Sequence, residues 1–173
     1  MVDTITVEVC MSSKGQEHPA ELAWRLAAFA FADVAGYSRA MGDDAMGTVR
    51  NWSQLREQLL LPSITEAGGK VIGGAGDSLL AEFPSATAAV TWALSVQKAI
   101  RLQSATAGSM QVRIGVNVDD VVDDGETLQS DGVNIASRIH QLAAPGEIVT
   151  TQVTRNWYAA ASTRPFVTLE PRR

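Results

Sequence analysis

The chain has 173 residues, 46% of them hydrophobic and 19% charged, with a formal net charge of −5 and one cysteine. This composition is typical of a globular protein and excludes a disordered one. The negative charge argues against a nucleic-acid partner, which needs a basic surface, and no apolar run approaches the roughly 20 residues of a membrane span. The start of the chain also lacks a secretory signal pattern, so we expect a cytoplasmic domain without a membrane partner.

The chain begins with a mixed, polar stretch over residues 1–20, which we expect to be an N-terminal extension of one domain over 21–173. An apolar run follows from Leu22 and stops at Asp33. Its weak alternation predicts a strand that is buried on both faces or lies at an interface.

A long helix is predicted over residues 43–66, where apolar residues recur near helical spacing. Asp43 or Asp44 can cap its start. Pro62 lies late in this segment and should kink the helix or split off a last turn.

Two short predicted strands follow, Lys70–Ile72 and Ser78–Phe83, on either side of the glycine-rich run Gly73–Asp77. Strands joined by a tight glycine turn form an antiparallel hairpin.

The other predicted elements are a helix over 85–102 capped by Ser85, a strand over 110–118 that continues to about 122, a helix over 131–142, a strand over 148–150, a helix over 153–161 and an extended piece over 166–169. The order strand, helix, two strands, helix, strand predicts an α+β fold. It is the ferredoxin-like βαββαβ core, with additions at its C-terminal end.

Two aspartates are candidate metal ligands, because Asp33 ends the first predicted strand and Asp77 lies in the hairpin turn. The first and third strands are neighbours in this topology, so both carboxylates can meet at one sheet edge. Hard oxygen ligands beside glycine-rich backbone suit Mg²⁺ with a bound polyphosphate. The alternative is that both aspartates only cap turns, as aspartates beside glycine often do.

Asn134 and Arg138 are four residues apart and share one face of a predicted helix. A carboxamide can orient a ribose and a guanidinium can brace a phosphate, although a solvated helix face explains the spacing equally well. His18 and His140 have no cysteine or carboxylate at ligand spacing, and we expect both at the surface.

Four segments together carry a family pattern: FADVAGYSRAMGDD (31–44), EAGGKVIGGAGDSLLAEF (66–83), VRIGVNVDDVV (112–122) and DGVNIASRIHQLAAPGEIVTT (131–151). From about Trp24 to Tyr158 the chain resembles the class III nucleotide cyclase homology domain of adenylate and guanylate cyclases, most of all the small bacterial adenylate cyclases. The resemblance implies a head-to-tail homodimer that makes a 3′,5′-cyclic nucleotide and pyrophosphate from a nucleoside triphosphate, with ATP as the expected substrate.

The resemblance also implies a role for each motif residue. Asp33, Asp77 and the carbonyl of Val34 would bind two Mg²⁺ or Mn²⁺ ions per site. Asn134 and Arg138 of the opposite subunit would orient the ribose and stabilise the transition state. The expected triphosphate contacts are Ala35, Gly36, Tyr37, Ser38 and Arg113.

The chain departs from the family where the base is read. The base-reading lysine is replaced by Gly73 and its usual aspartate partner by Thr127. A lysine that holds the triphosphate is missing beyond Leu169, where Arg172 or Arg173 could substitute. These departures predict weak activity or relaxed base choice in a cyclase. Two alternatives stay open: an inactive nucleotide- and metal-binding or regulatory module, and, ranked last, a nuclease or polymerase palm.

Overall fold

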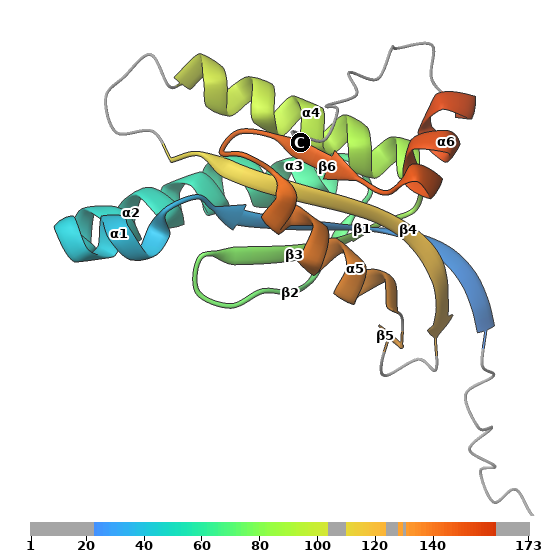
Figure 1. Ribbon diagram of the computed structural model, residues 1–173. Helices are drawn as coiled ribbons and strands as arrows, with labels where there is room; N and C mark the ends of the chain where they lie inside the picture. The colour runs from blue at the N-terminus through green and yellow to red at the C-terminus, as the bar shows by residue number, and fades with distance from the viewer. Residues whose placement is uncertain (1–22, 104–109, 124–127, 130, 162–173) are drawn as a thin grey trace, which may run out of the picture.

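The computed structural model describes residues 23–103, 110–123, 128–129 and 131–161. They form a six-stranded sheet in the order β2-β3-β1-β4-β5, with β6 paired to β4. Helices lie on both sides of this sheet (Figure 1). The predicted α+β, ferredoxin-like core is thereby confirmed.

The central strand β1 (Ala23–Val34) pairs antiparallel with both β3 (Ser78–Phe83) and β4 (Val112–Asp123). The predicted adjacency of the first and third strands is correct. The outer strands are β2 (Lys70–Gly73), antiparallel to β3, β5 (Leu128–Gln129), antiparallel to β4, and β6 (Ile148–Thr150), parallel to β4.

The two faces of β1 pack against different helices. Alternate residues from Ala28 to Val34 belong to the main core with α4 (Ala86–Gln103), while Ala27 and Phe29 pack with Ala136 of α5. Both faces are buried, as the weak alternation predicted. Figure 1 shows α4 on one side of the sheet and α5 on the other.

The predicted helix over 43–66 is interrupted. It consists of α2 (Ala45–Leu55), a π-helical turn η1 (Arg56–Leu60) and α3 (Leu61–Glu66). Pro62 has no N–H and its ring clashes with the carbonyl four residues earlier, so the wider π turn accommodates it. The predicted break is therefore confirmed, and the cap is Asp44, whose side chain accepts from the amide of Gly47 at 2.9 Å.

The remaining helices are α1 (Tyr37–Asp43), α5 (Asp131–Ile139), the 3₁₀ turn η2 (His140–Leu142) and α6 (Gln152–Ala161). The sequence missed α1 and β5 and placed the others within a few residues. The extended piece predicted over 166–169, like residues 1–20, lies outside the described residues. Among the helices described, none is both long and apolar enough to cross a membrane.

On the α5 side, the part of the sheet over β2 and β3 carries a buried charge. The Glu82 carboxylate lies 2.5 Å from Arg25 of β1 and 3.4 Å from Lys70 of β2. A buried carboxylate is tolerated because it is paired, and this pairing ties the three strands β1, β2 and β3 together.

Candidate metal and nucleotide site

Asp33 and Asp77 lie side by side at the end of the central strands. Asp33 pairs across the sheet with Ser78, the residue directly after Asp77. The amide of Val34 donates to the carbonyl of Asp77 at 3.3 Å and joins the two chain segments. The structure therefore brings the two predicted carboxylates together, with Val34 beside them.

The environment of Asp77 disfavours its ionised form. Partial burial raises the pKa of Asp77, and the charge of Asp33 raises it further, against the opposing effects of its own backbone amide and of Arg113. A bound cation would relieve this repulsion, so the electrostatics favour a positive ligand between them.

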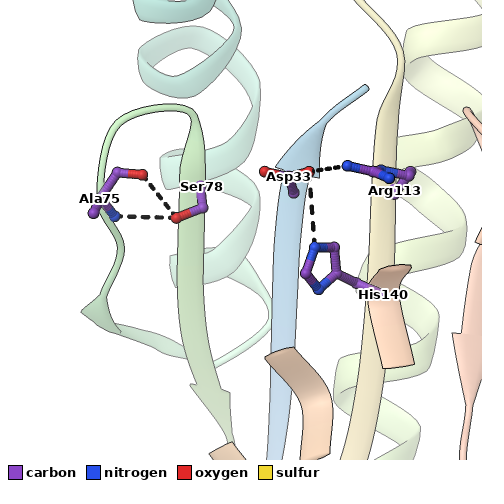
Figure 2. A network of polar contacts seen from close by, with 5 residues as sticks. All are labelled: Asp33, Ala75, Ser78, Arg113 and His140. Carbon is purple, nitrogen blue, oxygen red and sulfur yellow. Dashed lines mark hydrogen bonds and ion pairs between the residues drawn. The ribbon is translucent and has the colours of Figure 1, made fainter. Parts of the chain in front are cut away.

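Two groups from elsewhere in the fold hold Asp33. Arg113 of β4 stands opposite Asp33 in the strand register and forms an ion pair with its Oδ2 atom. The Nε2 atom of His140 lies 3.7 Å from the same oxygen. Figure 2 shows both contacts converging on one carboxylate oxygen, while the other oxygen faces the hairpin of Ala75 and Ser78. On that side Asp33 also interacts with the Asp77 side chain, so a cation bound there would meet both carboxylates.

The expectation that His140 lies at the surface is wrong. Its side chain is 8% exposed, and its ring centroid lies 4.6 Å from that of Phe31. Burial lowers the pKa of His140 although the nearby Asp33 charge raises it. The sequence held one usable signal: His140 follows Arg138 by two residues, so it must point to the opposite side of the helix.

The glycine turn before Asp77 is held at both ends. The Ser78 hydroxyl accepts from the amide of Ala75 at 3.1 Å and donates to its carbonyl at 2.8 Å (Figure 2). The indole N–H of Trp52 donates to the carbonyl of Gly76 at 3.0 Å. At Gly74, with φ at 139°, a Cβ would lie 2.5 Å from the carbonyl oxygen of Ser78, so glycine is required there. These contacts fix the backbone that presents Asp77.

The donor set fits a hydrated divalent cation. Among residues of the described ranges, no three His, Cys, Asp or Glu side chains gather in a way that could hold a metal ion. Mg²⁺ keeps waters and phosphate oxygens and takes one or two carboxylates. Asp33 and Asp77 therefore suit Mg²⁺ or Mn²⁺ bound together with a polyphosphate.

Ala35, the first residue of the predicted triphosphate-binding turn, already makes a backbone hydrogen bond within the protein. The amide of Ala35 donates to the carbonyl of Gln111 at 2.8 Å, so it is engaged within the sheet edge. Gly36, with φ at 74°, turns the chain into α1, where Tyr37 and Ser38 occupy the first turn without a side-chain cap. The predicted phosphate role stays a prediction for Gly36, Tyr37 and Ser38, and Ala35 has no free N–H to offer.

Asn134 and Arg138 are exposed on α5, whose inner face packs on β1 and β4. Arg113 of the same chain contacts Asp33. No such contact is described between the two aspartates and Asn134 or Arg138. Their exposure is what a role in the site of a second chain would require.

The base-reading positions are partly described. Gly73 ends β2 opposite Leu80, and a Cβ there would lie in ordinary contact, 3.7 Å from Leu80 Cδ2. The fold therefore does not require glycine at this position. Thr127 and the two arginines Arg172 and Arg173 lie outside the described residues.

The chain is similar to known cyclases. A Rhizobium meliloti (strain 1021) protein described as "Putative adenylate cyclase 3" is 36% identical over 127 residues, which are 72% of this chain and 22% of that protein. The crystal structure of an adenylate/guanylate cyclase/hydrolase from Silicibacter pomeroyi is 31% identical, with a TM-score of 0.77 over 87% of this chain and 89% of that one. The adenylyl cyclase CyaB from P. aeruginosa is 18% identical, with a TM-score of 0.69 over 81% and 83% of the chains.

No protein-family model matches the chain, and the chain spans only about a fifth of the length of its Rhizobium relative. The Silicibacter structure, by contrast, is matched over nearly its whole length at 31% identity. The fold, the paired aspartates and this similarity lead to one conclusion: the chain belongs to the adenylate/guanylate cyclase family, class III.

Proposed function

We propose that the chain is a nucleotide cyclase domain that converts a nucleoside triphosphate, ATP first among them, into a 3′,5′-cyclic nucleotide and pyrophosphate. The observation that carries this proposal is the Asp33–Asp77 pair. Two carboxylates in contact, one with a raised pKa, are a costly arrangement for a turn cap and a useful one for a cation site. Family membership supports the same reading.

In this proposal Asp33, Asp77 and the carbonyl of Val34 would hold two Mg²⁺ or Mn²⁺ ions. When bound, such ions supply positive charge that activates the attacking hydroxyl and stabilises the leaving oxygen. Arg113 already lies beside Asp33, and a polyphosphate bound there would offer its guanidinium further anionic oxygens.

The reaction is an in-line displacement within one nucleotide. The ribose 3′-oxygen forms a bond to the α-phosphorus and loses its proton to water. The bond from that phosphorus to the oxygen that bridges to the β-phosphate breaks, and pyrophosphate leaves with that oxygen. A guanidinium at Arg138 would stabilise the charge that develops on the phosphoryl oxygens, and the Asn134 amide would orient the ribose.

A second copy of the chain completes the site in this proposal. Asn134 and Arg138 are exposed on α5, so they are available to the site of a partner subunit. A head-to-tail homodimer then has two equivalent composite sites related by two-fold symmetry. A cytoplasmic location belongs to the same proposal.

The alternative function is a nucleotide- or metal-binding module without turnover. Gly73 favours it, because this position offers no side chain to read a base. Losing a buried hydrogen bond to a charged group costs about 1.5–3 kcal/mol of base discrimination. Within the cyclase proposal, the same glycine predicts relaxed base choice.

The deciding measurement is turnover of ATP, GTP, CTP and UTP with Mn²⁺, read as cyclic nucleotide and pyrophosphate. We expect product from the wild type and a loss of at least about 100-fold in Asp33→Asn, since even partners of metal ligands contribute 10–100-fold. Asp44→Asn is the matched control, because Asn caps a helix as well as Asp does. If no nucleotide gives product, the alternative function, a binding module without turnover, is supported instead. Product that persists in Asp33→Asn would exclude the two-carboxylate mechanism.

A gain of specificity is expected from Gly73→Lys. Gly73 is exposed, its backbone is not left-handed, and a Cβ there would meet Leu80 only in ordinary contact, so the fold accommodates a lysine. We expect the ratio of kcat/KM for ATP over CTP to rise about 10-fold or more, from one charged hydrogen bond to the base. Gly73→Ala is the control and should leave this ratio unchanged. If Gly73→Lys keeps the wild-type Tm and the ratio of kcat/KM for ATP over CTP does not change, the base does not bind next to residue 73.

A further inference from the structure

His140 joins two parts of the molecule that the proposed reaction uses separately. Its imidazole is buried against β1, with Nε2 3.7 Å from Asp33 Oδ2 and the ring 4.6 Å from the ring of Phe31. Its backbone belongs to η2, which continues α5 directly. The contact thus runs from the candidate metal site of this chain to the helix that carries Asn134 and Arg138.

The end of that helix packs closely on the sheet. At Gly115 of β4 a Cβ would lie 2.5 Å from the Ala136 carbonyl oxygen and 2.8 Å from the His140 amide nitrogen, which measures how closely α5 and η2 sit on the sheet. The Ala143 amide donates to the carbonyl of His140 at 3.0 Å and closes the 3₁₀ turn. Because the ring is buried and this backbone is closely packed, we expect a shift of the His140 ring at Asp33 to displace the helix end.

The opposite side of the same helix is the exposed one. Residues 138 and 140 are about 200° apart around a helix axis, and Arg138 is exposed while His140 is buried. In the proposed homodimer the exposed side serves the partner's site, whereas the buried side touches Asp33 of its own chain.

We propose that His140 is a positioning residue that couples the two active sites of the dimer, a step that rests on the proposed function. It orients Asp33 within its own site and, through the end of α5, sets the placement of Arg138 in the partner's site. When Asp33 binds or releases a cation, its Oδ2 atom shifts relative to His140. The packed end of α5 then shifts as well, and Arg138 moves with it. Coupling of this kind is reciprocal, so events at Arg138 also affect Asp33.

The first test needs no turnover. Mn²⁺ binding to the purified chain is titrated by the EPR signal of the free ion, without nucleotide. We expect about 10-fold weaker binding in His140→Leu, which keeps apolar volume over Phe31, and partial recovery in His140→Gln, which restores an N–H donor. Leu142→Ala, at an exposed residue of the same turn, is the control. Wild-type Mn²⁺ affinity in His140→Leu, or equal weakening in His140→Gln and His140→Leu, would overturn the positioning role.

The second test isolates the coupling in mixed dimers. A chain with Arg138→Ala supplies both carboxylates, and a chain with Asp77→Asn supplies Asn134 and Arg138, so each mixed dimer has one intact site. His140→Leu is then added to the Asp77→Asn chain, whose own His140 and Asp33 lie outside that intact site. We expect kcat to fall about 3- to 10-fold with little change in KM, and His140→Gln to fall less.

The outcomes distinguish a failure of the coupling from a failure of the composite homodimer. Unchanged kcat in that mixed dimer would overturn the coupling. If the Arg138→Ala and Asp77→Asn chains together regain no turnover although the wild type is active, the composite homodimer fails and the coupling with it. The Mn²⁺ titration would still decide whether His140 positions Asp33.

Discussion

Gly115→Ala is expected to lift the end of α5 from the sheet and to remove most of the proposed cyclase activity. The added Cβ would lie 2.5 Å from the Ala136 carbonyl oxygen and 2.8 Å from the His140 amide. Both are backbone atoms and cannot rotate away, so the helix must move. Overpacking of this kind costs about 1–3 kcal/mol, which lowers the Tm of a domain of this size by about 5 °C.

The control is Gly42→Ala, at a glycine in helix α1, where nothing lies within 4 Å of the new Cβ. It should keep or slightly raise the Tm, because alanine favours helix over glycine. Thermal unfolding and cyclic nucleotide formation are measured on both variants. A Gly115→Ala protein with wild-type Tm and turnover would contradict the close seating of α5 on β4.

The parts of the fold that could be predicted have local causes. The hairpin before Phe83 follows from its glycines, and the break near Pro62 follows from a missing N–H. The meeting of Asp33 and Asp77 needed the topology as well, because strands one and three become neighbours only in the βαββαβ order. The catalytic and cofactor roles came from family resemblance, since single aspartates beside glycine have a turn-capping alternative.

The parts that could not be predicted depend on contacts between distant segments. His140 is buried because α5 packs at Gly115, a fact about β4 that helix periodicity does not contain. The amide of Ala35 is occupied because Gln111, far along the chain, lies next to it. The ion pair of Asp33 with Arg113 likewise exists only through the pairing of β1 with β4.

The two possible roles of Asp77, cation ligand and turn cap, predict different effects of its substitution. Asp77→Asn is expected to lower turnover by at least about 100-fold and at the same time to raise the Tm at pH 7 in EDTA. Burial and the Asp33 charge raise the pKa of Asp77, so the ionised carboxylate destabilises the folded state. The amide carries no charge, and its oxygen still accepts the backbone N–H bond that the carboxylate accepted.

The stability gained by Asp77→Asn depends on pH. A carboxyl whose pKa is raised on folding binds its proton more tightly in the folded state, so stability falls as pH rises through that pKa. The stabilisation by Asp77→Asn should therefore be present at pH 7, shrink as pH falls through the raised pKa of Asp77, and be lost below the ordinary value of 3.8. Asp44→Asn, at an exposed helix cap, should show no such gain. A lower Tm of Asp77→Asn both at pH 7 and below pH 3.8, with turnover retained, would mean that Asp77 only caps the turn. The loss of a cap does not depend on repulsion between two charges, so it would lower the Tm at either pH.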